Sequence, residues 1–321
     1  MRLPRRLLPA LALPCIARAA HAQAPAPLRL IVGFTPGGTN DIVARLAAET
    51  MGPLLGQSIV VENRPGAGGM LAADLVAKAP PDGNTILLGG SGGLVIPSLV
   101  QARLPFDIAT GFAPIGMIGA APNVIVVHPA LPVRDMVELQ RVARAARPPL
   151  TFASPGIGST GHAAWAMLVV TLGIELEHIP YRGTAPALTD LIAGRVQVFT
   201  NALAPMAPHI ASGALRAVAV AGPRRSPAMP ELPSTAEQGF PAIDCATWWG
   251  LFAPAGTPAE RVARLHAALG TMLAQLEVRR RLLEGGVEIE ASESPAAFAR
   301  AFAEDRARWE PVMRAAGVRP E

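Results

Sequence analysis

The chain has 321 residues, of which half are hydrophobic, with 28 basic and 24 acidic side chains and two cysteines. A chain of this length can build one large core or two smaller ones. The excess of basic residues lies in the first 22 residues, which contain four arginines, so the remainder has 28 − 4 = 24 basic and 24 acidic groups. A formal net charge of zero gives no electrostatic support for binding nucleic acid or other polyanions.

Residues 1–22 have the layout of a secretory signal peptide. Arginines precede a short apolar run at 7–16, and Ala20-His21-Ala22 fits cleavage before Gln23. The run is too short to anchor the chain in a bilayer, and no later apolar run reaches the length of a membrane span. We therefore expect a soluble exported protein, cleaved near Ala22. The pair Arg5-Arg6 leaves both general secretion and the twin-arginine route open.

The rest of the sequence alternates strand-like and helix-like segments, which predicts an α/β protein with mainly parallel sheets. Strands are expected at 28–32, 59–62, 85–88, 123–128, 150–153, 176–179, 196–200, 215–221 and 248–253. Helices are expected at 41–54, 70–78, 133–146, 161–172 and 185–193. Two long helices close the chain, one opened by a capping box at Thr257 and one by Ser294. The proline-rich stretch 223–241 is expected to be irregular and exposed.

A strand followed by a glycine loop and a helix occurs twice in the sequence, which predicts two domains of related build. Chain order places residues 23–124 and 248–321 in domain 1 and residues 125–247 in domain 2. Chain crossings near 123–129 and 245–255 would then form the hinge. Cys245 is the only cysteine after the signal peptide, so no intramolecular disulfide is expected.

The two glycine loops are the main candidates for a binding site. The first glycine loop is Gly33–Asp41 and the second glycine loop is Ser154–His162. In each, a short apolar strand leads into a tight loop and a helix N-terminus, where free backbone N–H groups and the helix dipole favour an anion. Two such loops, more than a hundred residues apart, suggest one ligand held from both sides.

The first glycine loop offers backbone amides around Gly37, Gly38 and Thr39, with Asp41 ordering the loop as a cap. The alternative is a plain turn that needs glycine for its backbone angles. The loop lacks the Gly-Lys-Ser/Thr of a Walker motif and the Gly-x-Gly-x-x-Gly of a dinucleotide fold, which disfavours nucleotides. Gly66–Gly69 also has two interpretations. It is either a third loop that lines the binding cleft or a structural turn.

The second glycine loop adds hydroxyl and imidazole groups from Ser154, Ser159, Thr160 and His162. Its alternative interpretation is again a turn, with Ser159 as a helix cap. A catalytic interpretation, with Ser154 or Ser159 as nucleophile and His162 as base, is disfavoured because no Gly-x-Ser-x-Gly elbow is present. No histidine lies at metal-ligand spacing from another His, Cys or acid, so neither a metal site nor a cofactor is expected.

Five segments along the chain form a set of motifs: Gly33-Phe34-x-Pro36-Gly37-Gly38-x-x-Asp41-x-x-Ala44-Arg45, Glu62-Asn63-Arg64-Pro65-Gly66-Ala67-Gly68-Gly69, Ser154-x-Gly156-x-Gly158-Ser159, Pro180-Tyr181-Arg182-Gly183 and Pro254-Ala255-Gly256-Thr257-Pro258. Together they resemble the signature segments of the Bug/TctC-like receptors, the extracytoplasmic solute-binding proteins of tripartite tricarboxylate transporters. The resemblance covers essentially all of the mature chain, in order.

The resemblance implies a type II periplasmic-binding fold, in which two α/β domains joined by a two-strand hinge close on a small carboxylate. It implies a receptor without catalytic activity, whose partners are the membrane permease subunits of the transporter. By position, the ligand contacts it implies are Phe34, Gly37, Gly38 and Thr39 in the first loop, Ser154, Gly158, Ser159 and His162 in the second, and Ser91 in a further glycine-rich loop.

Family members often carry Phe-Asp-Asn where this chain has Phe199-Thr200-Asn201. We therefore add Thr200 and Asn201 to the candidate ligand residues. Loss of the acid should disfavour a ligand amine and favour a neutral or anionic distal group.

Two other functions stay open at this point. A sensor with the same fold would deliver its ligand signal to a membrane kinase of a two-component system, and genes for permease subunits or for a kinase beside it would separate the two roles. A secreted serine hydrolase is the more remote alternative, and it requires ester turnover that is lost in Ser154→Ala or Ser159→Ala. The sequence does not name the carboxylate.

Overall fold

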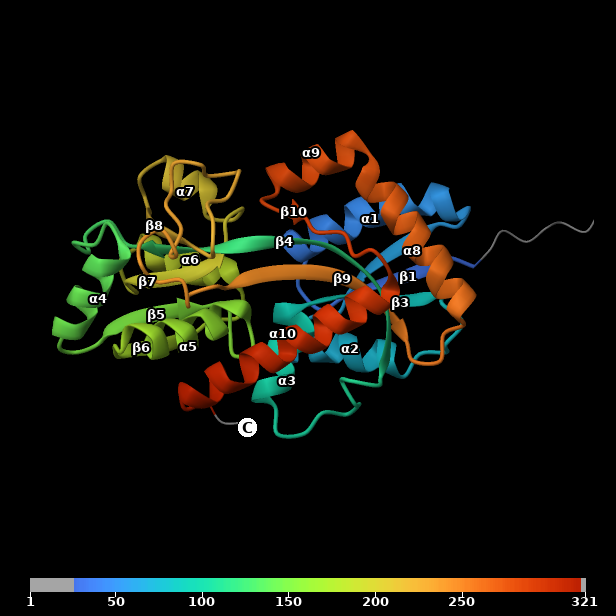
Figure 1. Ribbon diagram of the computed structural model, residues 1–321, viewed down its shortest axis with the longest axis horizontal. Coiled ribbons are helices and arrows are strands. Elements are labelled where there is room, and N and C mark those ends of the chain that lie inside the picture. The colour runs from blue at the N-terminus through green and yellow to red at the C-terminus, as the bar shows by residue number, and fades with distance from the viewer. Residues whose placement is uncertain (1–25, 319–321) are drawn as a thin grey trace, which may run out of the picture.

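The structure is a computed structural model that describes residues 26–318 (Figure 1). The predicted signal peptide, residues 1–22, lies outside the described residues. The described chain forms a mixed α/β protein around a long curled sheet, with helices on both faces. None of its helices combines the length and the apolar character needed to cross a membrane.

One ten-stranded sheet runs through the described chain in the order β2-β1-β3-β9-β4-β7-β5-β6, and β8 and β10 also pair with β4. The strands are β1 (Leu28–Val32), β2 (Ile59–Asn63), β3 (Thr85–Gly90), β4 (Phe112–Val127), β5 (Leu150–Ser154), β6 (Leu176–Pro180), β7 (Val198–Ala202), β8 (Arg216–Ala221), β9 (Ala246–Pro254) and β10 (Glu288–Ile289).

The helices lie between these strands and after them. They are α1 (Thr39–Leu55), α2 (Met70–Ala77), α3 (Ile96–Val100), α4 (Met136–Ala145), α5 (Thr160–Leu172), α6 (Thr184–Ile192), α7 (Ala207–Ala211), α8 (Ala259–Ala274), α9 (Leu276–Glu284) and α10 (Pro295–Ala315). A 3-10 turn, η1 (Ala67–Gly69), precedes α2, and a π-helical turn, η2 (Ser91–Val95), precedes α3.

Strand β1 lies in the middle of one half of the sheet, parallel to β2 and β3. Its sequence Leu-Arg-Leu-Ile-Val is apolar at every position but one, as is typical of a parallel strand covered on both faces. One face packs under α1 and α8, and Ile31 on the other face joins the core beneath α2. The carboxyl ends of these parallel strands therefore open at one edge, where the glycine loops follow.

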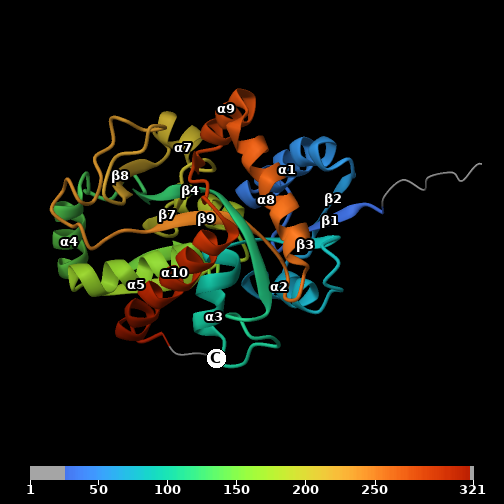
Figure 2. The ribbon, with the colours of Figure 1, turned by 45° about the vertical axis from the view of Figure 1, so that its right-hand side comes forward.

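Strands β4 and β9 connect the two halves of the sheet (Figures 1 and 2). The first part of β4 pairs with β9 as far as Pro122, whereas Asn123–Val127 pair with β7 and β8. On its other side β9 pairs with β3. Strand β4 thus pairs in both halves, and Cys245, just before β9, is hydrogen-bonded to Ala221 of β8 and to Asn123 of β4. Two segments of the chain therefore connect the halves, as a two-strand hinge requires. The domain boundaries at 124 and 248 remain a prediction.

Most predicted elements are present, and their ends differ from the structure by up to three residues. The strand expected at 123–128 is only the second part of β4, which has 16 residues. The first part was not predicted because two prolines and two glycines at 114–122 interrupt its strand pattern. The register with β9 shifts twice there. Helix α3, helix α7 and strand β10 were not predicted.

The first of the two long helices expected at the end of the chain, which was placed after Thr257, is two helices in the structure. Gln275 has extended backbone angles (φ −71°, ψ 127°) and separates α8 from α9, and Leu276 is 84 % exposed. The capping box predicted at Thr257 is also wrong, since its hydroxyl donates to the carbonyl of Pro254 instead. The predicted cap of α10 is confirmed, because Ser294 Oγ accepts a hydrogen bond from Ala297 N.

Candidate functional site

The first glycine loop joins β1 to α1 and is ordered by Asp41. This buried carboxylate accepts hydrogen bonds from Gly37 N at 3.0 Å, from Asn63 Nδ2 at 3.0 Å and from Arg45 Nε at 2.8 Å. Asn63 also donates to the carbonyl of Phe34. Burial opposes ionisation of Asp41, but the hydrogen bonds from Arg45, Gly37 and Asn63 outweigh it and lower the pKa of the carboxyl.

The N-terminus of α1 is open toward solvent. Its N-cap, Gly38, has extended backbone angles and no side chain to satisfy the first amides of the helix. Among residues 26–318, no atom accepts a hydrogen bond from the backbone N–H of Thr39 or Asn40. A Cβ built on Gly37 or Gly38 would meet no atom within 4 Å. The loop therefore presents free donors beside empty space.

The second glycine loop is held by its own hydroxyls and by two histidines. Ser159 caps α5, accepting from His162 N at 3.2 Å and donating to the carbonyl of Gly156 at 2.6 Å. Gly158 N donates to Nδ1 of His162 at 3.2 Å. Ser154 Oγ accepts from Gly156 N and pairs with Nε2 of His178 at 2.6 Å. The positive φ angles of Gly156 and Gly158 explain why glycine is needed there.

Close glycine contacts bring three loops of one half of the molecule together. A Cβ on Gly33 would lie 2.6 Å from Cα of Gly69, and one on Gly69 would lie 3.1 Å from Cα of Gly93. A Cβ on Gly93 would in turn lie 3.1 Å from the ring of Phe34. The segment Gly66–Gly69 is therefore packed between the first glycine loop and the loop that contains Ser91.

The second glycine loop lies against this cluster from the other half of the molecule. A Cβ on Gly92 would meet the backbone N of Thr160 at 3.4 Å, and one on Gly68 would meet the carbonyl of Ile157 at 3.5 Å. A Cβ on Gly158 would lie 3.2 Å from Cα of Pro97. The structure thus brings both predicted loops to one region, at the crossing of β4 and β9.

A polar chain at this crossing was missed by the sequence analysis. Thr160 Oγ1 contacts Thr247 Oγ1 at 2.8 Å, and Thr247 donates to Asn123 Oδ1 at 3.0 Å. Asn123 Nδ2 reaches Cys245 Sγ at 3.1 Å, and burial raises the pKa of this thiol to about 12. The N-terminus of α5 is therefore tied to both crossing strands.

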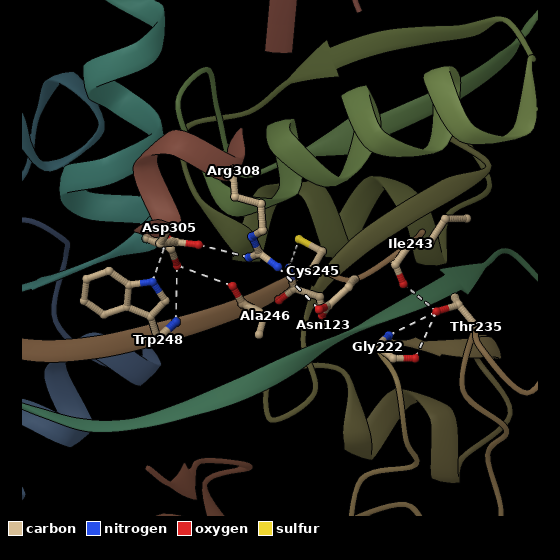
Figure 3. A network of polar contacts seen from close by, with 11 residues as sticks. Asn123, Gly222, Thr235, Ile243, Cys245, Ala246, Trp248, Asp305 and Arg308 are labelled. Atoms are coloured by element: carbon tan, nitrogen blue, oxygen red, sulfur yellow. Dashed lines mark hydrogen bonds and ion pairs between the residues drawn. The ribbon is translucent and has the colours of Figure 1, made fainter. Parts of the chain in front are cut away.

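Helix α10 is fastened to the same crossing (Figure 3). The indole Nε1 of Trp248 donates to Asp305 at 2.8 Å. Arg308 contacts Asp305 at 3.0 Å and Asp244 at 3.4 Å. On the other side, Trp249 Nε1 donates to Asn40 Oδ1 at 2.8 Å, which ties the start of α1 to β9. Both tryptophans are thus positioning groups in the structure.

The remaining candidates have defined environments. Ser91 is fully buried, and its hydroxyl accepts from Trp248 N at 3.2 Å. Asn201 Nδ2 donates to Thr184 Oγ1 at 2.8 Å. Thr200 is fully buried, and its Oγ1 has no hydrogen-bond partner within the described part of the chain. An unpaired buried hydroxyl is unusual and marks Thr200 as a residue to test.

The surroundings of the Ser154–His178 pair differ from those of a serine hydrolase triad. Ser154 is fully buried, and burial together with the nearby His162 lowers the pKa of His178 to about 4. No carboxylate within residues 26–318 is hydrogen-bonded to either histidine ring, so the third member of a triad has no counterpart there. The same residues contain no group of three His, Cys, Asp or Glu side chains suited to a metal ion.

The architecture and its crossing strands define a periplasmic-binding-protein fold. The chain belongs to the tripartite tricarboxylate transporter receptor family, because the model described as "Tripartite tricarboxylate transporter family receptor" matches residues 43–318. The resemblance seen in the sequence is thereby confirmed. It is a family of periplasmic binding proteins.

Individual relatives are similar over nearly their whole length. A "UPF0065 protein in tcbD-tcbE intergenic region" from Pseudomonas sp. (strain P51) is 37 % identical, covering 96 % of this chain and 93 % of that one. The structure titled "R. palustris Rpa4515 with adipate" has a TM-score of 0.85 at 36 % identity, covering 92 % and 99 %. MatC (Rpa3494) from Rhodopseudomonas palustris with bound malate has a TM-score of 0.81 at 33 % identity, covering 90 % and 99 %.

Proposed function

We propose that this protein is a periplasmic receptor that captures a small organic carboxylate and passes it, unchanged, to the permease subunits of a tripartite transporter. The observation that carries the proposal is the open N-terminus of α1, where Thr39 and Asn40 have free N–H groups beside exposed Gly37 and Gly38. Free amides and the positive end of a helix dipole favour a carboxylate. The similar structures with bound adipate and malate support this ligand class.

The second half of the molecule supplies the other contacts in this proposal. The N-terminus of α5 lies beside Gly92, and its cap, Ser159, belongs to the second glycine loop. A ligand that contacts both loops binds the closed arrangement better than an open one and therefore shifts the population toward closure. Export of the mature chain and the predicted hinge boundaries are part of the same proposal.

The candidate residues divide into two roles. Direct contact is proposed for residues of the two glycine loops and of the neighbouring end of β7, and loop positioning for four further residues that order the loops. Contact is proposed for Phe34, Gly37, Gly38, Thr39, Gly158, Ser159, Thr200 and Asn201. Positioning is proposed for Asp41, Ser91, Ser154 and His162.

Membership of the receptor family favours transport over the alternative role as input to a membrane kinase. Both roles begin with the same binding step. The buried Ser154, and a histidine pair without a hydrogen-bonded carboxylate within residues 26–318, disfavour the hydrolase alternative.

Substitution of Gly38 tests the binding site directly. The backbone of Gly38 is extended (φ −84°) and a Cβ there meets nothing, so Gly38→Leu should fold normally and project its side chain into the space proposed for the carboxylate. We expect adipate and malate binding by isothermal titration calorimetry to weaken at least about tenfold, the equivalent of about 1.4 kcal/mol.

Gly270→Leu is the matched control, because Gly270 is exposed on α8 and its Cβ position is also free. This variant should bind like the unaltered protein. Equal affinity in Gly38→Leu, or a response of the unaltered protein to sugars or nucleotides and to no carboxylate, would refute the proposal.

A further inference from the structure

A pocket of about 330 Å³ lies behind the second glycine loop, beside the end of α10. Helix α10 packs across α5 and α3 in this region (Figure 1). The pocket is bordered by α3, the second glycine loop, α5, β6 and the residues that follow α10. Its lining consists of Val100, Ile157, His162, Trp165, His178 and residues 316–318. This volume is at the lower end of the range of small-molecule sites.

One wall of the pocket is a stack of aromatic rings. The rings of His162 and His178 are 4.6 Å apart between centroids and almost parallel, with an interplanar angle of 6°. Trp165 lies 5.2 Å from His178 with an interplanar angle of 25°. Trp165 and His178 are only partly buried, so the stack borders the pocket rather than being enclosed in the core. Flat π surfaces of this kind favour another planar ring.

The polar groups of the wall define what such a ring should carry. Because Nδ1 of His162 accepts the hydrogen bond from Gly158 N, the proton of the neutral ring is on Nε2. No described residue accepts a hydrogen bond from this Nε2. Burial lowers the pKa of His162 to about 4, so the ring is neutral at physiological pH. The pocket therefore offers an uncharged donor to an acceptor atom.

Charge is absent from the described lining of the pocket, which otherwise consists of aliphatic groups such as Val100 and Ile157. A charged ligand would lose its hydration there without gaining an ionic partner among these lining residues. The lining thus discriminates against the carboxylates proposed for the glycine loops.

The pocket also faces away from the proposed carboxylate site. Successive helix residues are turned by about 100°, so His162 and Thr160 are separated by roughly 200° around α5. Thr160 contacts Thr247 at the strand crossing, whereas His162 stacks on His178 of β6.

We propose that this pocket is a second binding site, which takes a small, uncharged, planar aromatic molecule carrying a hydrogen-bond acceptor. The aromatic ring lies against the stack, and the acceptor atom receives the free N–H of His162. Aliphatic groups of α3, the second glycine loop and the end of α10 enclose the remaining side.

Benzamide is a suitable probe, because it combines a planar ring, a carbonyl acceptor and no charge. Ligand-observed saturation-transfer NMR and calorimetry on the full mature chain should show saturable binding of benzamide. Cyclohexanecarboxamide, which keeps the amide but has a puckered ring, and benzoate, which is charged, should each bind at least tenfold more weakly. Saturating adipate should not displace benzamide.

Ala316→Trp fills the pocket, and Ala315→Trp is its matched control on the exposed side of the same helix end. We expect the first variant to weaken benzamide binding at least tenfold and the second less than twofold, with adipate binding and the melting temperature unchanged in both. Absence of saturable benzamide binding, displacement by adipate, or equal binding to both variants would overturn the proposal. Adipate binding in the same samples tests the proposed carboxylate function separately.

Discussion

Asp41 shows how one buried side chain can prepare a backbone for binding. Its carboxylate fixes Gly37, Asn63 and Arg45, so the donors of the first glycine loop are ordered before a ligand arrives. Preorganised donors cost less entropy on binding than mobile ones. The first glycine loop is thus more than a turn, although its use in binding is our proposal.

Replacing Asp41 by Ala should lower the free energy of unfolding by about 2 kcal/mol, because Gly37, Asn63 and Arg45 lose the charged group that accepts their hydrogen bonds. The folded-state pKa of Asp41 is lowered, so its contribution is complete above the ordinary pKa of the carboxyl and is lost as the pH falls through the lowered value. Urea denaturation at pH 7 and pH 3 measures this, and the difference between the unaltered protein and the variant should shrink at pH 3. An equal difference at both pH values would contradict the account.

Thr200 carries a testable contribution to ligand selectivity. Its hydroxyl has no partner in the described chain, so Thr200→Val should leave the free energy of unfolding unchanged or slightly raised. If Oγ1 contacts the ligand, adipate affinity should fall about fivefold, which corresponds to the loss of roughly 1 kcal/mol of hydrogen bonding. Calorimetry together with thermal unfolding measures both quantities, and unaltered adipate affinity would remove Thr200 from the site.

At the scale of elements, local patterns predicted the strands and helices that have clean periodicity. Strand β1 and helix α5 needed only apolar runs and their flanking glycines or serines. The first part of β4 was invisible because Pro114, Gly116, Gly119 and Pro122 interrupt its pattern, and only pairing with β9 makes it a strand. The break at Gln275 likewise has no glycine or proline to announce it.

The residues of the candidate site likewise divide into those with local sequence signals and those that meet only through the fold. Both glycine loops could be found from the sequence, because glycine and helix-capping residues are local signals. The pairs Ser154–His178 and Thr160–Thr247 could not be found, since their members are 24 and 87 residues apart and meet only through the sheet topology. His162 was predicted as a ligand contact. In the structure its ring stacks on the ring of His178, between α5 and β6.

This stack should make the stability of the protein depend on pH. Burial lowers the pKa of His162 from 6.5 to about 4, so the unfolded chain binds a proton more readily than the folded one. Its stabilising contribution is complete above pH 6.5 and is lost as the pH falls toward 4, by at most roughly 3 kcal/mol.

Comparison of the unaltered protein with His162→Gln isolates this effect, because glutamine can accept the hydrogen bond from Gly158 but does not titrate. Chemical denaturation at several values between pH 7 and pH 4 should show a shallower loss of stability in the variant. Parallel pH profiles would show that His162 does not control the acid response.

At the scale of the whole molecule, the two halves of the sheet are connected through β4 and β9 and also meet at two other places. A Cβ on Gly92 would lie 3.4 Å from the backbone N of Thr160, and Ser226 Oγ donates to Glu288 at 3.0 Å. The crossing strands are therefore the common support of every loop that we assign to the ligand. We infer that ligand capture depends on how closely the halves approach.

The position of the ligand in a crystal structure with adipate tests the central claim most directly. We predict one carboxylate group of adipate within hydrogen-bond distance of the N–H groups of Thr39 or Asn40, with the second glycine loop on its other side. An adipate bound elsewhere, or clear adipate binding in solution with no ligand between the two glycine loops in the crystal, would contradict the account.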